Sequence, residues 1–239
     1  MTKPEKEQLL ERAKDFFLEK IAKPHLRNVE KLKDLDEFTV NPLLDRYLAR
    51  FLTGAATPEA LAKTLVLPRV LGTSITTTFG TQMQKFCGDV LQAGMGSKIL
   101  GIDVEFVDAL DGRRKYCQVK SGPNTINVGD IEEIAGKFKK IKNLAKTNSV
   151  KDLQHADLCV GILYGTREQL NSRYRALENE HNICVFIGED FWHRLSGEPD
   201  FYSELAEAFA DSVSSINSTK ELERATQQLA AEIKKRDED

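Results

Sequence analysis

Residues 99–120 read ILGIDVEFVDALDGRRKYCQVK, and their pattern indicates the fold class of the chain. Residues 99–107 alternate apolar and polar side chains, as a half-buried strand does. Residues 108–112 have the Asp and Gly content of a turn, and residues 114–120 form a second strand-like run. We therefore expect an antiparallel hairpin.

The segments after this hairpin continue an α/β pattern. Residues 130–146 carry apolar side chains at helical spacing, with Asp130 as a plausible N-cap. Two short apolar runs, 157–165 and 182–188, predict buried strands. Further helices are expected over residues 188–195, 200–213 and 218–236. The predicted core order is therefore strand, strand, helix, strand, strand.

The segments before the hairpin predict helices. Residues 5–34 have roughly helical spacing, which we expect Pro24 to break. A helix should start at Asn41 and stop at Gly54, and another should open at Thr57 and end at Pro68. Residues 76–91 suit an amphipathic helix that Gly94 and Gly96 close.

The fold class is thus α/β, a mixed sheet core with a helical N-terminal region and C-terminal helices. We expect residues 1–75 to form the helical region and residues 76–239 the core with its C-terminal helices. A chain of 239 residues can bury both in one compact unit.

Composition narrows the classes of function without choosing one. Residues 1–150 carry 24 Lys and Arg against 19 Asp and Glu, whereas residues 151–239 carry 10 against 18. The net charge of −3 therefore still permits a local DNA-binding surface. The chain has no apolar stretch of membrane-spanning length, and its charged N-terminus is unlike a signal peptide, so we expect a cytoplasmic protein. The four cysteines indicate reduced core thiols.

The hairpin also carries the candidate chemistry. Side chains two apart on a strand share a face, so Asp103 lies with Glu105, and Gln118 lies with Lys120. Carboxylate and amide oxygens suit Mg²⁺, and a lysine beside the metal can orient or deprotonate a water. This cluster suits phosphodiester hydrolysis. The alternative is a surface hairpin with a cross-strand ion pair.

The spacing from Asp103 to Gln118-Val119-Lys120 resembles the PD-(D/E)XK nuclease signature. Further blocks between residues 40 and 195 are similar to the PmeII-type group of type II restriction endonucleases. These blocks are Asn41-Pro42-Leu43, Leu52-Thr53-Gly54, Leu67-Pro68-Arg69-Val70 with Gly72, KSGPNTIN at residues 120–127, Val160–Gly165 and Glu189–Trp192.

The resemblance implies a restriction-endonuclease-like fold and a homodimer that cuts both strands of a short palindromic DNA site with Mg²⁺. It makes Asp103 a metal ligand and Lys120 the catalytic lysine. Gln118 occupies the usual acidic position as the other metal ligand, and Ile102 replaces the usual proline. Because an amide is a weaker ligand than a carboxylate, Glu105 is the candidate for the missing charge. The helical N-terminal region would supply dimerisation and DNA grip.

Candidate DNA contacts lie near this signature and in two other segments. Asn and Ser are also common in turns, and a lysine-rich helix face is often just solvated, so a structural role remains open for each. The candidates are Arg69, Ser121, Asn124, Thr125, Asn127, Lys139 (with its neighbours Lys137, Lys140 and Lys142), Arg173 and Arg175.

Three other functions remain open on these residues. The first is a repair or recombination nuclease with the same core and no strong sequence preference. The second is a DNA-binding module whose active site has decayed, suggested by Gln118. The third is a structural α/β protein whose hairpin holds a plain salt bridge.

Overall fold

The computed structural model describes residues 2–88, 102–147 and 153–238. Contacts divide the chain into two compact units, Met1–Ala13 with Gly80–Ala208 and Lys14–Phe79 with Phe209–Asp239. We call the first the sheet unit and the second the helical unit. The expected helix end at Gly94 and Gly96, and the start of the expected strand at residues 99–101, lie outside the described residues.

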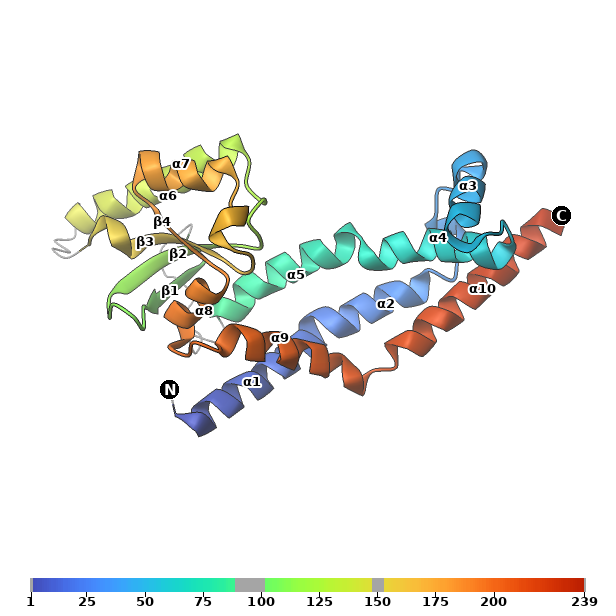
Figure 1. Ribbon diagram of the computed structural model, residues 1–239, viewed down its shortest axis with the longest axis horizontal. Coiled ribbons are helices and arrows are strands. Elements are labelled where there is room, and N and C mark those ends of the chain that lie inside the picture. The colour runs from blue at the N-terminus through green and yellow to red at the C-terminus, as the bar shows by residue number, and fades with distance from the viewer. Residues whose placement is uncertain (1, 89–101, 148–152, 239) are drawn as a thin grey trace. The chain divides into compact units, whose positions relative to one another are not determined.

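The sheet unit is built on a four-stranded mixed sheet in the order β1-β2-β3-β4 (Figure 1). Strand β1 pairs antiparallel with β2, whereas β3 runs parallel to both β2 and β4. The strands are β1 (Val104–Val107), β2 (Arg114–Lys120), β3 (Leu158–Ile162) and β4 (Cys184–Ile187). The expected α/β fold with a mixed sheet is confirmed, and β2 has the predicted bounds.

Helices α6 (Val128–Thr147) and α7 (Ser172–His181) lie on one face of this sheet, and α8 (Glu189–Ser196) lies on the other (Figure 1). Apolar residues of α6 and α7 pack in one cluster with Leu158, Val160 and Ile162 of β3. Phe191 of α8 lies against Gly161, which faces the opposite side of β3. The helices are α5 (Thr73–Phe86), α6 (Val128–Thr147), α7 (Ser172–His181), α8 (Glu189–Ser196) and α9 (Phe201–Ser212), with short 3₁₀ turns η4 (His155–Asp157) and η5 (Arg167–Gln169).

Helix α7 was missing from the sequence prediction. It connects β3 to β4, and parallel neighbours need such a crossover connection. The helix is almost entirely polar, and it buries just Tyr174 and Leu177. Its apolar pattern was therefore too sparse to stand out in the sequence.

A buried charge network closes the far end of the hairpin. Gly112 has φ +70° in the turn, which allows its N–H to bond the Asp108 carbonyl at 2.8 Å. Lys115 of β2 is 1% exposed, and its Nζ lies 2.5 Å from Asp111 and 3.0 Å from a backbone carbonyl. Two arginines complete the network, Arg113 on Asp157 at 2.5 Å and Arg194 on Asp108 at 2.8 Å.

Three of the cysteines form a row across the sheet. Cys117 lies opposite Cys159 in the β2–β3 pair, and Cys159 lies opposite Cys184 in the β3–β4 pair. Cys117 and Cys159 are buried, Cys184 is half-buried, and Cys87 of the same unit is buried as well. All four are free thiols, and three of them are buried, as expected of core residues.

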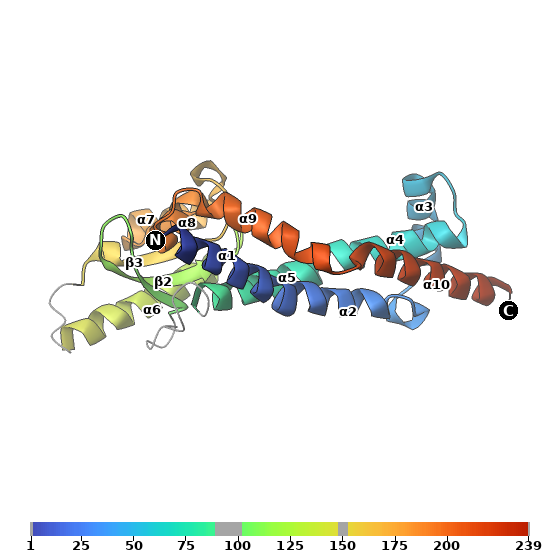
Figure 2. The same cartoon turned by 90° about the horizontal axis from the view of Figure 1, so that it is seen from below.

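In the helical unit, α2, α4 and α10 lie side by side (Figures 1 and 2). Helix α10 packs against both α4 and α2, around a core that includes Val66, Leu229 and Ile233. Helix α3 projects beside α4 at one end of this unit. The helices of this unit are the π-helix η1 (Leu18–Ala22), α2 (Lys23–Lys31), η2 (Leu35–Glu37), α3 (Pro42–Thr53), α4 (Pro58–Leu71), η6 (Val213–Ser215) and α10 (Ser218–Glu238). Helix α1 (Lys3–Phe17) is divided between the two units after Ala13.

The caps predicted for α3 and α4 are confirmed, but two predicted proline breaks are wrong. Asn41 caps α3, which ends at Gly54 with φ +79°, and Thr57 caps α4. Pro24 lies in the first turn of α2, where a missing N–H costs little, and a π-helical turn joins it to α1. Pro68 lies inside α4, which continues for three more residues to Leu71.

The sequence predicted a boundary between residues 75 and 76. The structure changes from the helical unit to the sheet unit between Phe79 and Gly80. Helix α10 packs with α4 and α2 and belongs to the helical unit. None of the helices within the described residues is both long and apolar enough to cross a bilayer.

Candidate active site

The hairpin places Gln118 and Lys120 on the face of the sheet that α6 covers. The register pairs Val104 with Cys117 and Glu105 with Tyr116, so Tyr116, Gln118 and Lys120 share a face. Gln118 lies beside the buried Val160, and Lys120 beside the buried Ile162. Gln118 is 4% exposed, whereas Lys120 keeps part of its side chain accessible at the strand end.

Asp103, immediately before β1, reaches the same place. Its N–H bonds the Cys117 carbonyl at 3.1 Å, and its Oδ2 accepts the N–H of Val119 at 2.8 Å. Val119 stands between Gln118 and Lys120, so the carboxylate lies beside the residue that separates them. The structure therefore places the Asp103 carboxylate next to the stretch of β2 that carries Gln118 and Lys120, and the roles of the three residues stay predictions.

The Asp103 carboxylate is partly desolvated. Burial raises the pKa of Asp103, while the Val119 N–H and the charges of Lys137 and Lys120 act in the opposite direction. Two lysines from different elements, α6 and β2, thus act on one carboxylate. A carboxylate in this setting gains from a bound cation, because a cation offsets the cost of its ionised form.

Lys120 has an acidic partner on α6. Its Nζ lies 3.5 Å from Oδ1 of Asp130, and both side chains are mostly buried, at 24% and 21% exposed. The other Asp130 oxygen accepts the Asn127 N–H at 2.7 Å. Asn127 in turn accepts from Gly129 N and Asp130 N, so Asn127 is the N-cap of α6. The prediction of Asp130 as the N-cap was wrong by three residues.

Glu105 contacts a residue at the other end of β2 from Lys120. Its carboxylate pairs with Arg114 at 3.5 Å, and its backbone lies opposite Tyr116. Its partner Tyr116 is two residues before Gln118, and the Val104–Cys117 pair lies between them. Its part in the site stays a prediction.

Helix α5 contributes residues that the sequence did not single out. The Gln84 Nε2 donates to the Val119 carbonyl at 2.9 Å, and Gly80 lies close to the Ser121 side chain. Cys87 is buried near Asp103, whose charge adds to burial in raising the Cys87 pKa. Nothing in a single sequence distinguishes Gln84 from other polar helix positions, because its contact depends on how α5 docks on β2.

The loop after Lys120 is held by α7. The Thr125 hydroxyl donates to the Gly122 carbonyl at 2.8 Å, and the Tyr174 hydroxyl also donates to it at 3.1 Å. Asn171 Nδ2 reaches the Ile126 carbonyl at 3.3 Å. Asn124 is exposed at the turn, and Ser121 is half-buried next to Lys120. Thr125 and Asn127 therefore have structural contacts beside the DNA-binding role predicted for them.

The basic candidates lie on α6 and α7. Lys139 and Lys140 are exposed on α6, whereas Lys137 pairs with Glu133 at 2.5 Å and Lys142 contacts His155 at 2.9 Å. On α7, Arg175 is exposed. Arg173 has a buried Nε that lacks a hydrogen-bond partner within the described part of the chain.

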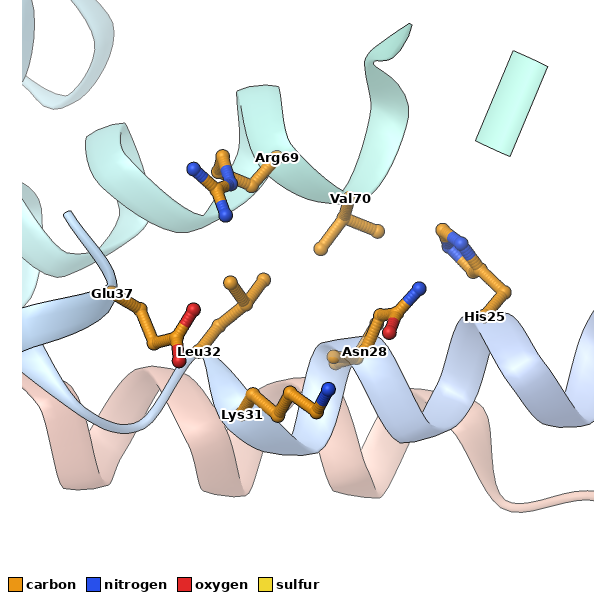
Figure 3. A pocket seen from close by; sticks show the side chains of 8 residues that line it. His25, Asn28, Lys31, Leu32, Glu37, Arg69 and Val70 are labelled. Atoms are coloured by element: carbon orange, nitrogen blue, oxygen red, sulfur yellow. The ribbon is translucent and has the colours of Figure 1, made fainter. Parts of the chain in front are cut away.

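Arg69 belongs to the helical unit and not to the cluster around Lys120. It lines a pocket of about 240 Å³ between α2 and α4, across from Asn28 and Lys31 (Figure 3). Its guanidinium also lies 5.8 Å from the centre of the Phe38 ring. The structure thus places Arg69 in a polar pocket of the helical unit.

The donors beside Lys120 suit a hard cation. Across the described residues, no cluster of three or more His, Cys, Asp or Glu has the geometry of a metal site. Mg²⁺ does not need one, because it keeps several waters and binds through one or two carboxylates and substrate phosphates. The Asp103 carboxylate and the Gln118 amide oxygen are donors of the right chemistry.

Comparison with known proteins adds one match. A family model described as type II restriction endonuclease EcoO109I matches residues 11–217. A search of curated proteins gave no match. The matched range includes Asp103, Gln118 and Lys120.

Proposed function

Since the chain belongs to the type II restriction endonuclease EcoO109I family and is thus a DNA nuclease, we propose that it cuts both strands of a short palindromic site with Mg²⁺. The observation that carries this proposal is the Asp103 carboxylate held on the N–H of Val119, between Gln118 and Lys120. A metal ligand and a lysine are then neighbours at the accessible end of β2. The blocks shared with the PmeII-type group support a closer relation to that group.

In this proposal Asp103 and Gln118 hold the metal. Bound Mg²⁺ would polarise the scissile phosphate and lower the pKa of a coordinated water. Asp103 contributes the charge, and burial strengthens its attraction for a cation. Gln118 contributes an uncharged oxygen from a buried position.

Lys120 would act on the attacking water. Its Nζ can orient the water by donating a hydrogen bond, or accept its proton when neutral. The Lys120 backbone pairs with Ile162 of β3, and the N–H of Leu163 bonds the Lys120 carbonyl at 3.0 Å. A catalytic group on a strand is positioned more accurately than one on a loop.

DNA contacts are proposed for the residues around this strand end. Ser121 and Asn124 adjoin Lys120, and exposed Lys139 and Arg175 offer positive charge on the two helices of the same face. Thr125, Asn127 and Arg173 lie between these groups in the loop and on α7. Arg69 would contact DNA from the helical unit, for which we keep the predicted role in DNA grip.

We further propose a homodimer that forms through α3. Its outer side exposes Leu43 at 89%, Leu44 at 50%, Tyr47 at 61%, Phe51 at 75% and Leu52 at 58%. With about 200 Å² per large side chain, these five residues expose roughly 700 Å² of apolar surface. That is more than the largest patch on most monomers and close to the roughly 800 Å² that each partner buries in a stable complex.

A second copy of the chain is the occupant that fits this surface best. Paired active sites match the two strands of a palindrome, because the two-fold axis of a dimer coincides with that of the DNA. The stripe of Leu43, Tyr47 and Phe51 follows a four-residue spacing, so two α3 helices can pack side against side.

The test is digestion of unmethylated phage DNA with Mg²⁺, with wild type beside Lys120→Ala. We expect discrete fragments from the wild type and none from Lys120→Ala. The two proteins should have the same melting temperature. Sequencing of the fragment ends would then give the recognition site. A smear would instead support a nuclease without sequence preference, and DNA binding without cleavage would support a decayed site.

A further inference from the structure

The neutral side chain at position 118 leaves Lys120 without an acid on its own strand. In the nuclease signature a carboxylate normally stands two residues before the lysine and shares its face, but here that residue is Gln118. The acid whose contact the structure shows is on a helix: Oδ1 of Asp130 lies 3.5 Å from the Lys120 Nζ. We propose that Asp130 is the positioning residue of Lys120 and replaces, from α6, the carboxylate missing from β2.

Asp130 is oriented for this role by its second oxygen. Oδ2 accepts the Asn127 N–H at 2.7 Å at the start of α6, which fixes the plane of the carboxylate. Oδ1 is then directed to Lys120. Both side chains are about four-fifths buried, so solvent screens their attraction less than it would on the open surface.

Asp130 also belongs to the same electrostatic cluster as Asp103. The Asn127 N–H lowers the pKa of Asp130, and the charges of Lys120 and Lys137 lower it further. Those two lysines are the cations that act on Asp103. Glu133 pairs with Lys137 and also lies in the field of Lys120, so three carboxylates and these two lysines act on one another. Removal of Asp130 would take away the acid that the structure places on the Lys120 Nζ.

Glu105 does not take this role. It pairs with Arg114, and its register partner is Tyr116, at the other end of the shared face from Lys120. Of Glu105 and Asp130, the structure thus connects Asp130 to the lysine.

The inference rests on the proposed nuclease function, and Asp130→Asn tests it with little change in fold. An asparagine keeps an oxygen for the Asn127 N–H and removes just the charge. We expect kcat for cleavage to fall about 100-fold, because a small misplacement of a catalytic group has that effect. DNA affinity measured with Ca²⁺ in place of Mg²⁺, and the melting temperature, should stay near the wild-type values.

The decisive variant is Gln118→Glu combined with Asp130→Asn. It restores a carboxylate two residues before Lys120 on the same face, so it should recover most of the lost kcat. The matched control is Glu132→Gln, which removes an exposed charge from the same helix and should cleave like wild type. Wild-type cleavage by the Asp130→Asn variant, or no recovery in the double variant, would overturn the inference.

A second readout does not depend on cleavage. Lysines methylated with ¹³C give one NMR signal each, and the Lys120 signal can be assigned by its loss in Lys120→Arg. We expect it to shift in Asp130→Asn and to move back in the double variant. An unchanged signal would overturn the positioning role even in an enzyme that cuts DNA. A shifted signal in a protein that never cuts would support the role and reject the nuclease function.

Discussion

Gly161 of β3 lies directly against the ring of Phe191 from α8, and a Cβ atom at position 161 would overlap with that ring. Phe191 is fully buried and also packs edge-on against Phe106. The ring therefore has no room to retreat, since core side chains are packed at crystal-like density. Strand β3 and helix α8 approach closely at this point because residue 161 has no side chain.

Gly161→Ala should thus destabilise the sheet unit. Overpacking of this kind costs about 1–3 kcal/mol, which a denaturant titration of the full chain would measure. Gly122→Ala is the matched control. Its new Cβ would lie 2.5 Å from the Tyr164 hydroxyl, but Tyr164 is 49% exposed and can swing away. Equal stability of the two alanine variants would contradict this account.

Lys137→Met should move the acid limb of the cleavage profile to higher pH. Burial raises the pKa of Asp103, and the Lys137 charge partly offsets that increase. Without this charge the pKa of Asp103 rises further, so a smaller fraction is ionised at a given acidic pH. The measurement is kcat against pH from about 5 to 8 in Mg²⁺, a range around neutrality.

The control for that profile is Lys139→Met, which removes an exposed charge from the same helix. Lys139→Met should lower DNA affinity and leave the acid limb of the cleavage profile at the wild-type pH. An equal shift in Lys137→Met and Lys139→Met would contradict this account. It would mean that the total positive charge of the helix, and not Lys137 alone, determines the pH of the acid limb.

Lys115→Met should weaken folding strongly at neutral pH. It would leave Asp108, which is fully buried, with one cation fewer, and Asp111 without the ammonium 2.5 Å away. Removal of one partner from a buried ion pair costs about 3–5 kcal/mol. Urea unfolding would measure this loss of unfolding free energy. A loss of less than about 1 kcal/mol would mean that solvent screens these ion pairs.

The same network gives stability a defined dependence on acid pH. Although burial alone would raise it, the pKa of Asp157 is lowered by the Arg113 hydrogen bond, the Gln154 N–H and the charges of Arg113 and Lys115. A carboxyl group with a lowered folded-state pKa contributes stability above its unfolded pKa, near 3.9, and loses it as pH falls further. Asp157→Asn should therefore flatten the decline in unfolding free energy below about pH 4. An unfolding free energy that falls equally steeply with pH in Asp157→Asn and in the wild type would contradict this expectation.

Substitution of Leu43 and Phe51 by serine should yield a monomer. Both residues are largely exposed on α3, and their loss removes the centre of the proposed interface. Sedimentation would show the mass fall from that of a dimer, and double-strand cutting would be lost with it. Leu110→Ser, on the exposed hairpin turn, should leave the mass unchanged. A monomeric wild type at micromolar concentration would reject the interface.

The parts of the fold that depend on local chemistry were predictable. Asn41 and Gly54 delimit α3 because one caps an N-terminus and the other adopts φ +79°, and both properties belong to single residues. The bounds of β2 followed from alternation and from the turn that ends at Gly112. Pro68 misled the prediction because a proline near the C-terminus of a helix removes one bond without stopping the last turn.

The part of the candidate site that lies on the hairpin was predictable from the sequence, and the contacts from the helices were not. Asp103, Gln118 and Lys120 come together through strand pairing, which the sequence pattern encodes. The Asp130 and Gln84 contacts depend on how α6 and α5 dock on the sheet, and no spacing in the chain reports that. The sequence predicted Asp130 as the N-cap of α6, which is Asn127 instead, and the contact of Asp130 with Lys120 comes from tertiary packing.

The row of cysteines across β2, β3 and β4 makes the chain a reporter of its own unfolding. Burial raises the pKa of Cys159 well above its usual value and raises that of Cys184 as well, so these thiols resist ionisation at neutral pH. An alkylating reagent reacts with thiolates and needs access to them. Labelling at these positions would therefore be slow while the strands stay paired, and would count the molecules in which they have separated.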